Sequence, residues 1–263
     1  MNIIVCVKQV PNTNEVRINQ ETGTLIRDGV PSIINPDDRN ALEEALALKD
    51  LHGGKVSVIS MGPPQAKEAL KEALAMGADE AVLVTDRAFG GSDTWATATI
   101  LAAAVEKIGE YDLVFCGRQA IDGDTAQVGP EMAEFLNLPQ ITYCKEIKVD
   151  RENIIVNRFT ETGDYVLEVK PPVLLTAIKE LNKPRYPFVR GIFEAYDGPD
   201  QVEVYTLEDL DVDVTQIGLK GSPTNVYKSF VPVRSQNSEM IEGFNSKEKA
   251  AALVDKLHDL KLI

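Results

Sequence analysis

At 263 residues, the chain exceeds the usual size of one domain, which favours one large domain with an appendage over two equal domains. Its 44% hydrophobic and 26% charged residues are typical of a globular protein, and no apolar run of about 18 residues is present that could span a membrane. A formal net charge of -14 disfavours binding to nucleic acid and to anionic membranes, so we expect protein or small-molecule partners.

The N-terminal half alternates between strand-like and helix-like patterns. Apolar, β-branched runs typical of buried parallel strands occur at residues 3–7, 56–59, 81–84 and 113–116. Stretches with the apolar spacing of amphipathic helices occupy residues 37–51, 64–76, 94–108 and 131–136. This alternation predicts a doubly wound α/β fold with a mostly parallel sheet, in which ligands bind at the carboxyl ends of the strands.

The pattern changes from about residue 141. Short strands separated by polar turns are predicted at residues 147–149, 154–156 and 165–169, which indicates an antiparallel hairpin extension, and residues 173–177 again resemble a buried strand. Two segments rich in Pro, Gly or Ser, at 184–199 and 218–229, are predicted to be long loops.

The C-terminal segment differs in composition from the rest of the chain. Residues 235–242 are polar and linker-like, and residues 246–260 form a predicted amphipathic helix capped by Ser246. We therefore predict a nucleotide-binding α/β domain over residues 1–232 and an arm ending in a helix over residues 233–263. The arm either contacts a partner subunit or folds back on its own domain, and the sequence weighs these equally.

Residues 116–131 carry the strongest functional pattern. They begin where a buried strand ends and lead into a helix whose first turn is expected to hold residues 125–129. Unpaired N–H groups and the positive end of the helix dipole suit this place to phosphate oxygens. Gly123 and Gly129 allow the backbone to approach a ligand closely.

Polar side chains in the same segment fit two interpretations. Thr125 and Gln127 can donate hydrogen bonds to phosphate oxygens. Alternatively, Asp122 or Asp124 caps an ordinary helix that binds nothing. The residues alone favour neither interpretation over the other.

A second loop, residues 89–94, precedes the third predicted helix. Its glycines superficially resemble the pyrophosphate loop of ATP-dependent synthetases, but that loop normally follows a first strand. We therefore expect Ser92 or Asp93 to cap the helix. Thr94 and Thr97 would still face the crevice at the strand ends.

Two further segments are expected at the same edge of the sheet. The run Asn35-Pro36-Asp37-Asp38 is typical of a helix start, and Met61 closes the second strand. Turn chemistry alone explains each of them, but their common position favours a pocket for an adenosine.

Independent catalysis has little support. His52 and His258 lie in polar helical settings without a triad or metal-ligand pattern, and the acidic run 208–213 lacks the spacing of a calcium loop. No Walker A motif is present, and no GxGxxG motif follows the first strand. We therefore expect neither a catalytic residue nor a metal site.

The cysteines and the N-terminus indicate a cytoplasmic protein. Cys6, Cys116 and Cys144 are an odd number, lie far apart and form no CxxC pair, as expected in a reducing compartment. The first residues lack the basic region and long apolar stretch of a secretory signal.

Several short motifs, in their order and spacing, resemble the β subunits of electron-transfer flavoproteins over essentially the whole chain. They are Cys6-Val7-Lys8-Gln9-Val10-Pro11, Asn35-Pro36, Met61-Gly62-Pro63, Met76-Gly77-Ala78-Asp79 and Gly117-Arg118-Gln119-Ala120-Ile121-Asp122-Gly123-Asp124. The resemblance implies an adenine-nucleotide α-hydrolase-like fold and a heterodimer with a larger, FAD-carrying α subunit. The β-subunit pocket of the family holds AMP in housekeeping members and a second FAD in electron-bifurcating members.

The resemblance also implies which residues meet the cofactor. The adenosine end would contact Cys6, Asn35, Pro36, Asp37, Asp38 and Met61. The phosphates would contact Ile121, Asp122, Gly123, Asp124, Thr125, Ala126, Gln127, Val128, Gly129, Pro130, Glu131 and Met132.

Residues 91–97, 122–130 and 189–191 resemble clostridial, NADH-oxidising members in particular. This implies that FAD in the β site takes a hydride from NADH, and that one electron goes to ferredoxin or flavodoxin. The other electron would go to the α-subunit FAD and an acyl-CoA dehydrogenase. Asp93 would then contribute to the site, with Thr94, Thr97 and Arg190 nearest the flavin.

Two alternatives stay open on the sequence. One is a housekeeping β subunit that holds AMP as a structural nucleotide, and the other is a stand-alone nucleotide-binding domain. The long C-terminal segment from residue 199 onward disfavours the second, because a small stand-alone domain does not require it.

Overall fold

The computed structural model describes residues 1–12, 17–18, 25–26, 31–227 and 238–263. The chain divides into two compact units, Met1–Tyr227 and Lys228–Ile263. The boundary predicted between residues 232 and 233 lies outside the described residues and stays a prediction.

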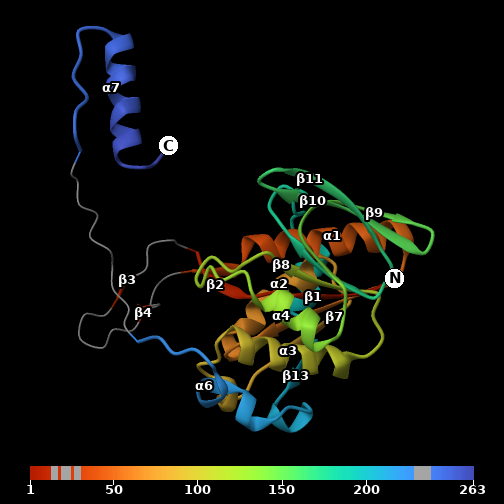
Figure 1. Cartoon of the computed structure of the whole chain (residues 1–263). Helices are drawn as coiled ribbons and strands as arrows, with labels where there is room; N and C mark the ends of the chain where they lie inside the picture. Colours follow the sequence, from red (N-terminus) through yellow and green to blue (C-terminus); the bar gives the residue numbers. More distant parts are fainter. Residues whose placement is uncertain (13–16, 19–24, 27–30, 228–237) are drawn as a thin grey trace. The chain divides into compact units, whose positions relative to one another are not determined.

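A nine-stranded sheet forms the centre of the first unit, in the order β11-β10-β9-β12-β8-β1-β6-β7-β13 (Figure 1). Its strands are β1 (Asn2–Cys6), β6 (Lys55–Met61), β7 (Glu80–Val84), β8 (Leu113–Gly117), β9 (Gln140–Asp150), β10 (Asn153–Thr160), β11 (Gly163–Val169), β12 (Val173–Ala177) and β13 (Val202–Tyr205). In this sheet order, the neighbouring strands from β9 through β12, β8, β1, β6 and β7 to β13 pair in parallel. The pairs β9–β10 and β10–β11 are antiparallel. The predicted α/β class, with a mostly parallel sheet and an antiparallel hairpin extension, is confirmed.

Two small sheets and a set of helices complete the described elements. The small sheets pair β2 (Gln9–Pro11) with β5 (Ser32–Ile34), and β3 (Arg17–Ile18) with β4 (Leu25–Ile26). The α-helices are α1 (Pro36–His52), α2 (Lys67–Met76), α3 (Thr94–Ile108), α4 (Val128–Phe135), α5 (Val189–Tyr196), α6 (Gly218–Gly221) and α7 (Ser246–Asp259). Short 3-10 helices lie at Pro64–Ala66, Arg87–Phe89, Leu207–Asp209 and Val214–Gln216. Among the described residues, no helix has both the length and the apolar character needed to cross a membrane.

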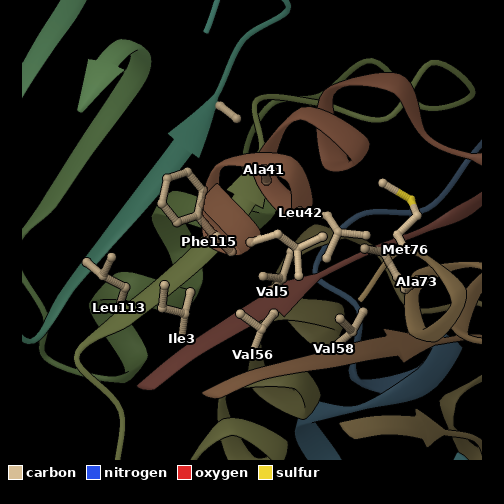
Figure 2. Packing of buried hydrophobic residues seen from close by; sticks show 14 of the residues in the cluster. Ile3, Val5, Ala41, Leu42, Val56, Val58, Ala73, Met76, Leu113 and Phe115 are labelled. Carbon is tan, nitrogen blue, oxygen red and sulfur yellow. The ribbon is translucent and has the colours of Figure 1, made fainter. Parts of the chain in front are cut away.

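The sheet is covered on both faces, which explains its continuous apolar strands. In β1, Ile3 and Val5 join the core cluster that includes side chains of α1, α2 and α5, while Ile4 and Cys6 join the cluster of α3 and α4. Figure 2 shows the first cluster, in which the strand side chains lie against α1 and α2. Full burial of a side chain such as Phe115 contributes about 1.5–3 kcal/mol to stability.

The structure corrects the predicted loops after residue 184. Residues 189–196 form helix α5, whose apolar residues have helical spacing but are flanked by Pro and Gly residues that favoured a loop. Residues 218–221 form the single turn α6, and residues 228–229 lie outside the described part. Strand β13 was not predicted because two of its four residues are exposed at the end of the sheet.

Two predicted helix starts are also corrected. Helix α4 begins at Val128, because Asp124 and Ala126 have φ angles of 56° and 54°, which a right-handed helix cannot contain. Helix α7 is capped by Asn245, whose side chain accepts a hydrogen bond from the N–H of Glu248, and Ser246 is its first residue.

Candidate nucleotide-binding site

Loops from neighbouring strands meet at the carboxyl edge of the sheet. Strands β8, β1, β6 and β7 lie side by side and run in parallel, so the segments that follow them share this edge. The start of α1 joins them, because the N–H of Asn35 donates to the carbonyl of Lys8, just after β1 (2.9 Å). The predicted segments after Cys6, Met61 and Gly117 therefore do lie at one edge.

The segment between β8 and α4 presents a row of backbone donors. Within the described part of the chain, the N–H groups of the five residues before Pro130 donate to no protein acceptor; these are Thr125, Ala126, Gln127, Val128 and Gly129. The positive φ angles of Asp124 and Ala126 alternate with the ordinary backbone between them, a conformation that gathers successive N–H groups into an anion-binding concavity. The positive end of the α4 dipole adds to the same place.

The capped-loop interpretation of this segment is wrong in its details. Gln127 precedes α4, and its side chain makes no capping hydrogen bond. Asp122 instead forms an ion pair with Lys8 (Oδ1 to Nζ, 2.8 Å), and Asp124 accepts a hydrogen bond from Gln119. Neither aspartate caps the helix, so the donor row is left for another acceptor.

The side chain of Asn35 holds the loop that follows β8. Its side-chain amide donates to the carbonyl of Gln119 (2.8 Å), and its Oδ1 accepts a hydrogen bond from the N–H of Ile121 (3.0 Å). Asn35 is fully buried. Its side chain therefore positions the loop.

Asp38 joins the ends of two strands. Its carboxylate accepts hydrogen bonds from the N–H groups of Lys8 (2.8 Å) and Gly117 (3.1 Å). Burial raises the pKa of Asp38 to about 7, although the hydrogen bonds from Asn35 and from these two N–H groups act to lower it. Burial likewise raises the pKa of Asp37, which forms an ion pair with Arg118 (3.3 Å).

Gly117 and Gly129 permit two close approaches. A Cβ on Gly117 would lie 2.6 Å from the backbone nitrogen of Asp38, so α1 rests directly on the end of β8. A Cβ on Gly129 would lie 3.0 Å from Cγ2 of Thr176 and 3.5 Å from Cβ of Cys116, so the first turn of α4 rests on β12 and β8. The donor row is thus seated on rigid strands.

The start of α3 forms the other wall. Asp93 caps α3 by accepting a hydrogen bond from the N–H of Ala96 (3.1 Å), which confirms the predicted cap. The hydroxyl of Thr94 donates to the carboxylate of Glu131 on α4 (3.2 Å), and burial raises the pKa of Glu131. Thr94 therefore lies beside the first turn of α4.

Ser222 and Thr224, which follow α6, contribute to this wall. Ser222 accepts a hydrogen bond from the N–H of Asp93 (2.9 Å), and the hydroxyl of Thr224 donates to the Asp93 carboxylate (2.7 Å). Hydrogen bonds lower the pKa of Asp93, although burial opposes them. Among the described residues, no group of three or more His, Cys, Asp or Glu side chains is arranged to hold a metal ion.

The comparisons with known proteins agree over most of the chain. The model of a protein family described as "Electron transfer flavoprotein domain" matches residues 22–212. The chain is 61% identical over 259 residues to the electron transfer flavoprotein subunit beta of Clostridium acetobutylicum, with 98% of both chains covered. It is 58% identical over 263 residues to the corresponding subunit of Thermoanaerobacterium thermosaccharolyticum, with 100% of both covered. The chain belongs to the electron transfer flavoprotein family, as a β subunit.

A third relative comes from a named complex. The β subunit is 53% identical over 264 aligned positions to a subunit of the caffeyl-CoA reductase-Etf complex of Acetobacterium woodii, with 100% of both chains covered. The resemblance stated from the sequence is therefore confirmed at the level of the family and the subunit.

The predicted site residues of this β subunit differ in what their side chains can do. Cys6 and Met132 are buried in the core between the sheet, α3 and α4, so they support the site from beneath. Met61 and Thr97 are half-buried, and Pro36 is the first residue of α1. Residues 121–125 are exposed, although the side chain of Asp122, which pairs with Lys8, is only 18% exposed.

Arg190 does not lie with the other predicted residues. It belongs to α5. Two residues before it, the N–H of Phe188 donates to the carbonyl of Ala75 in the last turn of α2 (3.0 Å). That turn leads into the start of β7, at the amino edge of the sheet. The Arg190 guanidinium is exposed and pairs with Glu194 (2.7 Å).

Sequence reasoning missed several residues that position the site of this β subunit. They are Lys8, Arg118, Gln119, Ser222 and Thr224. Arg118 and Gln119 stand beside the glycine-rich loop in the sequence, and this position of a charge and an amide is a usable signal. Lys8 lies 114 positions before Asp122, so only the fold brings it to the loop. Ser222 and Thr224 carry no such signal, because only the folding of a distant loop brings them to Asp93.

Proposed function

We propose that this β subunit binds FAD at the carboxyl edge of its sheet and accepts a hydride from NADH. One of the two electrons then passes to ferredoxin or flavodoxin. The other passes to the FAD of an α subunit and on to an acyl-CoA dehydrogenase. The alternative, AMP as a structural nucleotide in the same place, is the competing outcome of the tests below.

The row of unpaired N–H groups from Thr125 to Gly129 carries the proposal. A diphosphate needs several donors at once, and these five N–H groups, which lack a protein acceptor among the described residues, supply them. The positive φ angles of Asp124 and Ala126, which gather successive N–H groups, support this use of the donor row. Residues 121–132 would hold the phosphates chiefly through the backbone.

We expect the remaining predicted residues to lie around this row. Asn35 to Asp38 and Met61 would border the adenosine, and Asp93, Thr94 and Thr97 would border the flavin side. A flavin bound here supplies hydride and single-electron chemistry, while the protein supplies position and surrounding charge. Thr94, held by Glu131, would orient a ligand through its hydroxyl.

Anaerobic titration of the complex with NADH tests the electron donor. We expect NADH to bleach the flavin absorbance of the full chain purified with its α partner. The same sample treated with dithionite shows the full extent of bleaching. A complex that carries flavin, responds to dithionite and ignores NADH would contradict NADH as the electron donor.

The α subunit is proposed to engage the C-terminal arm, residues 233–263. Helix α7 has an amphipathic sequence, and none of its residues is buried among the described residues. An apolar stripe on such a helix is consistent with a partner that packs against it.

Helix α5 is proposed as the surface for the acyl-CoA dehydrogenase. Six large apolar side chains on and before this helix are exposed: Tyr186, Phe188, Val189, Ile192, Phe193 and Tyr196. A cluster of this size marks a docking surface, and the relative from the caffeyl-CoA reductase-Etf complex supports a partner of this class.

Replacing Phe193 with aspartate is expected to weaken dehydrogenase binding at least about tenfold, because a buried aromatic anchor contributes about 2 kcal/mol or more to an interface. Phe159→Asp on β10 is the matched control, since Phe159 is also exposed but lies far along the hairpin. Biolayer interferometry with the immobilised dehydrogenase measures both. Equal affinities for the two variants would contradict the assignment of α5.

A further inference from the structure

The predicted cofactor site is strongly acidic. Six carboxylates belong to it: Asp37, Asp38, Asp93, Asp122, Asp124 and Glu131. Residues 121–132 contain no Lys, Arg or His, and the single cation of the predicted set, Arg190, lies at the other edge of the sheet. A bound phosphate group would therefore meet repulsion, which at about 4 Å costs on the order of 1–4 kcal/mol per unit charge between water and a protein surface.

Among the described residues, two cationic side chains form ion pairs with these carboxylates. Arg118 pairs with Asp37 (3.3 Å), and its guanidinium also lies over the ring of Tyr143 (5.9 Å from the ring centroid). Lys8 pairs with Asp122 (2.8 Å), on the loop that leads directly to the donor row. The Arg118 guanidinium thus has two partners among the described residues, whereas the Lys8 ammonium has one.

The backbone of Lys8 is fixed, and its side chain is not. Its N–H donates to Asp38 (2.8 Å) and its carbonyl accepts from the N–H of Asn35 (2.9 Å), which anchors the residue at the end of β1. The Lys8 side chain is 48% exposed, and the ammonium can leave Asp122 without moving the strand. Asp122 lies only three residues before Thr125, the first free donor.

We propose that Lys8 is a phosphate-binding residue of this site: its ammonium leaves Asp122 and neutralises a phosphate group held by the N–H row. This inference rests on the proposed function and adds to it the source of positive charge. Asp122 keeps the ammonium at the site in the absence of a ligand. A nucleotide that binds exchanges a carboxylate for a phosphate as the partner of Lys8.

The test measures calorimetric binding of adenosine, AMP and ADP to the full chain purified with its α partner and freed of exchangeable nucleotide. For Lys8→Met, we expect ADP to bind about 10- to 100-fold more weakly, since a hydrogen bond to a charged group contributes about 1.5–3 kcal/mol. The loss should be smaller for AMP and below about twofold for adenosine. Lys8→Arg should recover most of the ADP affinity.

Lys145→Met is the matched control. Lys145 pairs with Asp164 at a similar distance (2.7 Å) and exposure on the hairpin, away from the site. Its replacement should leave the affinities for all three probes unchanged. Circular dichroism of each variant checks folding.

Asp122→Asn separates direct binding from loop support. If Lys8 contacts phosphate, this variant frees the ammonium, and ADP should bind at least as tightly as to the natural chain. Equal losses in Asp122→Asn and Lys8→Met, extending to adenosine, would show that Lys8 only supports the loop and would overturn the inference. Unchanged ADP affinity in Lys8→Met would also overturn it while the proposed function stands. A natural chain that binds none of the probes would overturn both.

Discussion

Replacing Gly117 with alanine is expected to lower the free energy of unfolding by about 3 kcal/mol and to abolish nucleotide binding. The added Cβ would lie 2.6 Å from the backbone nitrogen of Asp38 and 2.7 Å from the carbonyl carbon of Asp37, so backbone, rather than a flexible side chain, would have to move. Moving the start of α1 away from β8 also breaks the hydrogen bond from Gly117 to Asp38. Urea denaturation measures the first effect, and calorimetry with ADP measures the second.

Gly123→Ala provides the stability control for this prediction. Gly123 lies in the same loop, but a Cβ there would meet nothing within 4 Å, and its φ angle is one that alanine accepts. We expect its free energy of unfolding to change by less than about 0.5 kcal/mol. Equal stability of the two alanine variants would contradict the close packing of α1 on β8.

Asn35→Ala is expected to produce the second largest effect. The change leaves the carbonyl of Gln119 and the N–H of Ile121 without partners, at a cost of about 2–4 kcal/mol in the free energy of unfolding. Because the same two bonds hold the phosphate loop, affinity for ADP should fall at least about tenfold as well. Urea denaturation and calorimetry measure the two quantities on one preparation.

Asn182→Ala distinguishes loss of stability from loss of the site. Asn182 donates to the carbonyl of Asn40 (3.0 Å) and to Glu44 (2.9 Å), away from the loop. This variant should lose stability but keep the ADP affinity of the natural chain. A parallel fall in ADP affinity in both variants would indicate that general destabilisation, and not the position of the loop, governs binding.

The framework of the site is predictable from the sequence for a physical reason. Strands buried on both faces must be apolar throughout, so their ends are visible where polar or glycine residues begin, as at Gly117 and after Met61. Helix starts such as Asn35-Pro36 and Asp93 carry their own capping chemistry. Since parallel strands share a carboxyl edge, these local signals suffice to bring the loops together.

Other parts of the site depend on contacts that no local pattern contains. The left-handed backbone at Ala126 follows from the packing of the whole loop, because alanine has no intrinsic preference for positive φ. Likewise, the position of Arg190 follows from the docking of α5 against α2, which the flanking Pro and Gly residues conceal. The ion pair of Lys8 joins residues 114 positions apart.

The nucleotides released from the purified complex test the central claim most directly. The full chain, co-purified with its α subunit, is denatured, and the released nucleotides are separated and counted against protein. The proposed function predicts two FAD molecules and no AMP per heterodimer. One FAD together with one AMP would contradict it and identify the β site as a structural AMP site.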